Sequence, residues 1–149
     1  MPESVLRILA VDWGERRIGL AVSDPAGIIA TGLKTLVVRG PADALARVAA
    51  AAAECEADRI VVGLPLLMSG ERGEAAQLAQ RFADALAART GLPVNTYDER
   101  LTSALSERRM REVGKRPGRA RTRVDQGAAV ALLESYLLRV RATAGGEEG

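Results

Sequence analysis

The stretch "AVDWGERRIGLAVSD" (residues 10–24) decides how the fold of this chain begins. An apolar run that starts at Val5 ends on a carboxylate, Asp12, and a second apolar run starts at Ile18. Two strand-length apolar runs joined by a short polar connection are typical of an antiparallel pair of strands. The sequence therefore predicts a strand that ends on an acid, one turn away from two arginines.

Further apolar segments extend this pair into a mixed sheet. A third run over 28–38 completes an antiparallel meander of three strands. In chain order, the other predicted elements are a helix over 42–57, a strand over 59–64, a helix over 74–89, a strand over 94–99, and helices over about 102–111 and 124–141. Right-handed crossovers join such alternating strands and helices. The prediction is an α/β fold with a mixed five-stranded sheet flanked by helices.

Length and composition predict one soluble domain. The chain has 149 residues, of which 48% are hydrophobic and 27% are charged, as in ordinary globular proteins. Residues 1–141 are expected to form the domain, and 142–149 a disordered tail. No apolar stretch has the length of a membrane span, and the N-terminal residues lack the apolar segment of a signal peptide. We therefore expect a cytoplasmic protein with no membrane partner.

The absence of histidine restricts the chemistry more than the single cysteine does. Cys55 excludes a disulfide within the chain and is expected to be a small buried residue of a helix. Without imidazole, a metal ion would be held mainly by oxygen ligands. The composition therefore favours Mg²⁺ or Mn²⁺ over zinc.

The charge of the chain is unevenly distributed. Residues 107–123 contain eight basic and two acidic residues, a local net charge of +6, whereas the whole chain carries only +2. The rest of the chain is therefore acidic, with a net charge of −4. A solvated helix and loop would explain a basic segment, but this asymmetry favours nucleic acid as the partner.

Three acidic positions can meet at one edge of the predicted sheet. Asp12 ends the first strand and Asp98–Glu99 end the last, and ligands gather at the carboxyl ends of parallel strands. If these two strands are neighbours, their carboxylates meet. Asp125 begins the last helix, on the stripe that would pack on the sheet. Three converging carboxylates can hold two divalent ions for phosphodiester hydrolysis.

Each of these acids also has an ordinary structural explanation. Asp12 can be a turn residue, and Asp125 can cap its helix. Because successive side chains of a strand alternate between its faces, Asp98 and Glu99 cannot both face the site in a regular strand. The other acid is expected to pair with Arg100 or to cap the next helix. The residues alone leave open which of the two is the ligand.

The loop over 62–73 supplies candidate phosphate contacts, Ser69 and Arg72. An ordinary strand-to-helix connection explains the same residues at least as well, and the loop lacks the lysine of a P-loop. Aromatic residues make up only 3% of the chain. Trp13 is the one aromatic residue near the site that could stack on a base. A packing role beside the turn is the favoured interpretation of this residue.

Four separated motifs stand out along the chain: "DWGERRIGLAVSD", "VVGLPLLMSGERG", "DERLTS" and "VDQGAAVALLESYL". Together they resemble the YqgF/RuvX family of RNase H-like nucleases, in the family's order and spacing over residues 7–138. The resemblance implies an RNase H-like fold and metal-dependent endonucleolytic cleavage. It assigns the catalytic, metal-binding acids to Asp12, Glu99 and Asp125, and so favours Glu99 over Asp98.

Two positions depart from the family pattern. The loop usually reads "GLPLNMDG", whereas here Leu67 and Ser69 replace the asparagine and the aspartate. Ser103 stands in "DERLTS" where threonine is usual, which keeps the hydroxyl. Members of the family are described as nucleases that mature the 5′ end of precursor 16S rRNA and, earlier, as Holliday junction resolvases.

The leading hypothesis is therefore an endonuclease, dependent on Mg²⁺ or Mn²⁺, that processes precursor 16S rRNA in ribosomal precursor particles. The alternatives are a resolvase of branched DNA, which would need a homodimer rather than a monomer, and a non-catalytic RNA-binding factor of ribosome assembly. The residues predicted to bind nucleic acid are Arg16, Arg17, Ser69, Arg72, Arg100, Lys115, Arg116, Arg119, Arg121 and Arg123. An actin-like ATPase would need a second lobe, for which the chain has no room.

Overall fold

The sheet is built outward from strand β1 (Ile8–Asp12), in a computed structural model that describes residues 7–65, 69, 71–102 and 127–140. The antiparallel half follows β1 directly: β2 (Arg17–Ser23) pairs with β1, and β3 (Ala30–Val37) pairs with β2. The turn between β2 and β3 is held by Asp24, whose carboxylate accepts the backbone N–H groups of Ile28 and Ile29 at 2.7 and 2.8 Å. The predicted meander is therefore present.

The parallel half consists of two crossover units. Helix α1 (Pro41–Glu54) leads to β4 (Arg59–Leu64), and helix α2 (Glu74–Thr90) leads to β5 (Val94–Asp98). α1 begins with proline in its first turn, where no N–H is needed, and continues in alanines, which favour a helix. α2 ends at Gly91, whose φ of 73° is the left-handed conformation that closes many helices.

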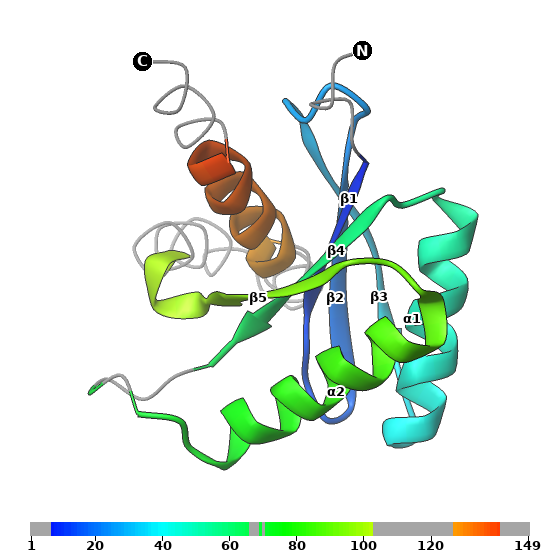
Figure 1. Cartoon of the computed structure of the whole chain (residues 1–149), viewed down its shortest axis with the longest axis vertical. Coiled ribbons are helices and arrows are strands. Elements are labelled where there is room, and N and C mark those ends of the chain that lie inside the picture. Colours follow the sequence, from blue (N-terminus) through cyan, green and yellow to red (C-terminus); the bar gives the residue numbers. More distant parts are fainter. Residues whose placement is uncertain (1–6, 66–68, 70, 103–126, 141–149) are drawn as a thin grey trace, which may run out of the picture.

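The strand order is β3-β2-β1-β4-β5 (Figure 1). β4 lies between β1 and β5 and is parallel to both, so β1 and β5 do not pair. The predicted α/β fold with a mixed five-stranded sheet is confirmed, but the first and last strands are not direct neighbours. β4 suits a place between two strands because it is an apolar strand, buried from Ile60 to Leu64, as in parallel sheets covered on both faces.

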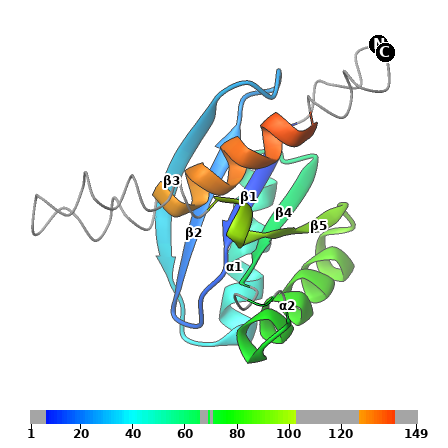
Figure 2. The ribbon, with the colours of Figure 1, turned by 90° about the vertical axis from the view of Figure 1, so that its left-hand side faces the viewer.

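Helices cover the two faces of the sheet differently. α1 and α2 lie on one face, where Leu9, Val11 and Val62 of the strands pack with Val48 and Phe82 of the helices. A helical segment over 127–140 crosses the other face (Figures 1 and 2). There, Leu133 and Tyr136 pack with Ile8, Ala10 and Val61. None of the helices in the described ranges is long and apolar enough to cross a membrane.

The helical segment over 127–140 has a defined direction on the sheet. Tyr136, near its end, accepts a hydrogen bond at 3.4 Å from Arg59, the first residue of β4. The preceding residue, Ser135, shares a 2.7 Å hydrogen bond with the hydroxyl of Tyr97. The beginning of the segment lies toward the carboxyl ends of the parallel strands (Figure 1).

Several boundaries differ from the sequence prediction. β3 covers Ala30–Val37 rather than 28–38, and α1 ends at Glu54 rather than at residue 57. β5 ends at Asp98, one residue early, because Glu99 begins a short 3₁₀ helix, η1 (Glu99–Thr102). The predicted helix over about 102–111 and the predicted tail over 142–149 lie outside the described residues, apart from Thr102, which closes η1.

Candidate active site

Two carboxylates from different strand ends meet at the carboxyl edge of the sheet. Asp12 is the last residue of β1, and Glu99 directly follows β5. β4 lies between β1 and β5. The side chains of Asp12 and Glu99 can therefore meet only by extending over β4.

Gly63 of β4 makes that reach possible. The register pairs Val11 with Val62, which places Gly63 next to Asp12 along the edge. A Cβ atom built on Gly63 would lie 2.5 Å from Oε1 and 3.0 Å from Cγ of Glu99. The Glu99 side chain therefore lies directly over the bare backbone of β4, in space that any other residue at this position would fill.

The contact between the two acids changes the protonation of Glu99. Burial disfavours its charged form, a hydrogen bond joins it to the Asp12 side chain, and the charges of Asp12 and Asp98 add repulsion. Together these effects raise the pKa of Glu99 to about 8. Two carboxyl groups that share a proton in this way are a donor set suited to a hard divalent cation, which replaces the proton and neutralises both charges.

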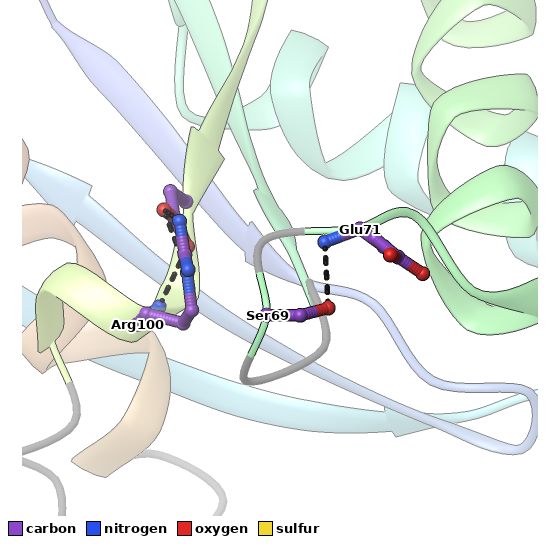
Figure 3. Close-up of polar contacts among 4 residues, drawn as sticks. Ser69, Glu71 and Arg100 are labelled. Atoms are coloured by element: carbon purple, nitrogen blue, oxygen red, sulfur yellow. Dashed lines mark hydrogen bonds and ion pairs between the residues drawn. The ribbon is translucent and has the colours of Figure 1, made fainter.

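Asp98 turns to a different partner. Its carboxylate accepts hydrogen bonds from the Arg100 guanidinium, the shortest being 2.7 Å, and from the Arg100 backbone N–H at 2.9 Å. These contacts hold the pKa of Asp98 below its ordinary value. Figure 3 shows Arg100 joined by dashed lines to this acid. The two adjacent acids thus have different partners, one pairing with Asp12 and the other with Arg100.

The loop between β4 and α2 forms the rim beside this edge, because β4 and β5 end side by side. Ser69 is exposed, and its hydroxyl accepts the Glu71 backbone N–H at 3.3 Å (Figure 3). Arg72 is also exposed and donates to the Gln80 side chain at 3.5 Å. Leu67 lies outside the described residues.

The connection between β1 and β2 begins directly at Asp12. It requires glycine at position 14, since a Cβ there would lie 2.5 Å from the carbonyl oxygen of Arg17. Arg16 in this turn and Arg17 at the start of β2 are both exposed. Trp13 packs on Phe82, with ring centroids 6.4 Å apart, as the packing interpretation predicts, and the side chain is only partly buried.

The remaining predicted site residues lie outside the described ranges: Asp125, Lys115, Arg116, Arg119, Arg121 and Arg123. Within the described ranges, no group of three or more acidic or cysteine side chains could hold a metal ion, so the site as described is a carboxylate pair. Asp125 precedes by two positions a helical segment whose beginning lies toward this edge of the sheet.

Gly63 is the site residue that sequence reasoning missed. A signal was present, because a glycine inside an otherwise apolar strand marks a bulge or a close approach of other atoms. What the sequence did not show is which atoms approach. The tyrosine contacts that hold the segment over 127–140 against β4 and β5 were not foreseen either.

The chain is similar in sequence to known proteins. The family model described as "RuvX: Holliday junction resolvase" matches residues 6–139. A Chloroflexus aggregans protein named "Putative pre-16S rRNA nuclease" is 47% identical over 87% of this chain and 92% of its own. A Mycobacterium tuberculosis protein of the same name is 44% identical over 96% of this chain and 85% of its own.

The fold also resembles that of a solved structure. The chain of Thermus thermophilus RuvC in a complex with a Holliday junction substrate superimposes with a TM-score of 0.65, over 93% of this chain and 96% of that chain. The two sequences are 17% identical, so this likeness concerns the fold.

Proposed function

Because this chain belongs to the RuvX family, we propose that it is an endonuclease that hydrolyses phosphodiester bonds of structured nucleic acid with a divalent cation. One observation carries the proposal: Asp12 and Glu99, which come from strands that do not pair, meet over the bare backbone of Gly63. A partly buried pair of acids in contact destabilises a fold unless something neutralises it, which indicates function rather than stability.

The residues that would hold Mg²⁺ or Mn²⁺ are Asp12, Glu99 and Asp125, and the side chains of the first two already contact each other. Bound ions of this kind activate the attacking water and stabilise the leaving oxygen of a phosphodiester. Asp98 is not included, since its carboxylate is bound by Arg100.

The basic residues around the edge would hold the substrate. Arg16 lies in the turn that follows Asp12, Arg17 begins β2, and Arg72 lies in the loop that follows β4. Arg100 directly follows Glu99 in the chain, and its guanidinium is paired with Asp98. The basic segment 107–123 joins the strand end that carries Glu99 to the helix that follows Asp125. Phosphate contacts of this kind position a strand without reading its sequence.

The proposed substrate is precursor 16S rRNA, cut at its 5′ end. The names of the relatives in Chloroflexus and Mycobacterium favour it. Such a substrate would place the protein in the cytoplasm, on ribosomal precursor particles. The second candidate is branched DNA, which the description of the matching family favours.

Cleavage assays on both substrates test the proposal. Precursor 16S rRNA and a four-way DNA junction are incubated with wild type, Asp12→Asn or Asp125→Asn, in Mg²⁺ and in Mn²⁺. We expect the wild type to cut and both variants to fall to background. Asp84→Asn, which changes an exposed acid of α2, is the matched control and should cut like the wild type.

Each outcome selects one function. Cleavage of the RNA alone supports the 5′-end nuclease, and paired cuts in the junction alone support the resolvase. Sedimentation adds a second criterion, because symmetric paired cuts need a dimer. Failure of the wild type to cut either substrate in both metals would overturn the nuclease and favour a non-catalytic RNA-binding factor.

A further inference from the structure

A hollow of about 340 Å³ lies beside the candidate active site, and the proposed mechanism does not use it. Its walls come from three separate parts of the chain. Trp13 and Arg16 belong to the connection that starts at Asp12, Arg39 and Pro41 to the beginning of α1, and Leu78 to α2. Figure 1 shows this connection at the same end of the molecule as the beginning of α1.

The hollow combines two kinds of surface. Trp13, Pro41 and Leu78 provide an apolar wall, and the contact with Phe82 at 6.4 Å holds the indole ring in place. Arg16, Arg39 and Glu15 also line the hollow, and all three are exposed, so its charged side chains sum to a net charge of +1. In the part of the chain that the structure describes, neither guanidinium makes a hydrogen bond or an ion pair.

The apolar wall continues into a second hollow of about 370 Å³. The two hollows share Trp13, Pro41 and Leu78, and the second adds Phe82 and Arg81. The indole ring thus stands between two depressions, each of which also has at least one arginine in its wall. An aromatic wall with arginines around it matches a nucleotide, whose base stacks on apolar rings and whose phosphates bind guanidinium groups.

We propose that this hollow binds one unpaired nucleotide of the substrate, with its base against Trp13 and Leu78 and its phosphates at Arg16 and Arg39. The nucleotide must be unpaired, because a base within a duplex has both faces stacked and cannot lie against a protein ring. Trp13 directly follows Asp12 but lies on the side of α1 and α2. A substrate strand bound at the carboxylates would therefore cross the carboxyl edge of the sheet to place a nucleotide in the hollow. The proposal rests on the proposed function in one respect, namely that the ligand is nucleic acid.

The chain offers a direct probe of this site, because Trp13 is its only tryptophan. Its fluorescence is followed while a single-stranded hexanucleotide is titrated in EDTA, so that no cleavage takes place. Hexauridylate and hexathymidylate are used in parallel, since either RNA or DNA could supply the base. An abasic hexamer carries the same phosphates without bases, and a duplex of the same length carries only paired bases.

We expect saturable quenching of Trp13 by at least one of the two hexanucleotides, and none by the abasic hexamer or the duplex. Arg39→Ala and Arg16→Ala should each weaken this binding about tenfold and lower the salt dependence, as log K against log[salt], by about 0.7. Arg89→Ala is the matched control, because Arg89 is exposed near the other end of α2. It should shift the affinity less than twofold.

The result separates this inference from the proposed function. Quenching without cleavage of the RNA or the junction would support the hollow as a nucleotide site while the nuclease fails. Cleavage without quenching would overturn the hollow and leave the nuclease standing. Equal quenching by the abasic hexamer, or equal losses in Arg39→Ala and Arg89→Ala, would also overturn it.

Discussion

The two faces of strands β1 and β4 serve different purposes at the carboxyl edge of the sheet. On the face toward α1 and α2, Leu9, Val11 and Val62 remain apolar to the end of the strands and are fully buried. On the opposite face, the apolar residues Ala10 and Val61 give way to Asp12 and Gly63. Strand alternation separates the two environments by only one residue. One face can therefore carry the stability while the other holds charged groups that oppose it.

The largest expected effect comes from the apolar face. Leu9→Ala should lower the free energy of unfolding by about 2–5 kcal/mol, because it leaves a cavity in a close-packed core. Chemical denaturation measures this loss. The cleavage rate per folded molecule should stay near that of the wild type, since the Leu9 side chain lies on the face away from Asp12. If the cleavage rate per folded molecule of Leu9→Ala fell well below that of the wild type, the two faces would not be independent.

The next effect is expected at Gly63, the glycine of β4 that lies under the Glu99 side chain. Gly63→Ala should weaken Mn²⁺ binding by at least about tenfold, because the new Cβ displaces the Glu99 carboxylate and small misplacements at a site are costly. Titration calorimetry measures this affinity. Gly40→Ala is the matched control, since a Cβ at Gly40 meets no atom within 4 Å. Equal affinities in the two variants would contradict the role assigned to Gly63.

A further effect is expected in the pH dependence of stability in EDTA. The pKa of Glu99 rises in the folded state from an ordinary 4.5 to about 8, so the folded protein holds a proton that the unfolded chain loses. The resulting stabilisation is complete below about pH 4.5 and is lost as the pH rises to about 8. The free energy of unfolding should therefore fall over this window.

Glu99→Gln should remove most of the fall in the free energy of unfolding between about pH 4.5 and pH 8. Mg²⁺ should raise the free energy of unfolding of the wild type most near pH 8. Asp24 and Asp98 titrate below their ordinary value of 3.8, outside the window. Denaturation at several pH values, with and without Mg²⁺, measures these changes. A stability that rises steadily from pH 5 to pH 8 in EDTA would contradict the assigned protonation.

The smallest effect is expected at Asp98, the half-buried acid next to the pair, whose partner Arg100 is exposed. Asp98→Asn removes the charge that binds Arg100, but exposed ion pairs contribute only about 0–1 kcal/mol. Thermal denaturation should show little change. Mn²⁺ affinity should also stay within a few-fold of the wild type, and a loss as large as that of Asp12→Asn would make Asp98 a ligand.

Local patterns were sufficient for most of the fold. The strand predicted over 59–64 has those bounds in the structure, because six consecutive residues without polar alternation suit a strand covered on both faces. Alternation also indicated that only one of Asp98 and Glu99 would face the site. It did not indicate which one, because that depends on where the strand stops and η1 begins.

The sequence by itself determined the strands, the helices, the acid that ends β1 and the absence of imidazole chemistry. Only the tertiary structure decided that β4 lies between the two acids, that Gly63 leaves room for them to meet, and that Trp13 shares a hollow with Leu78 of α2. The physical reason is the distance along the chain between the residues involved. Side-chain periodicity reports how a segment is covered, whereas a site depends on atoms that approach from segments far apart in the chain.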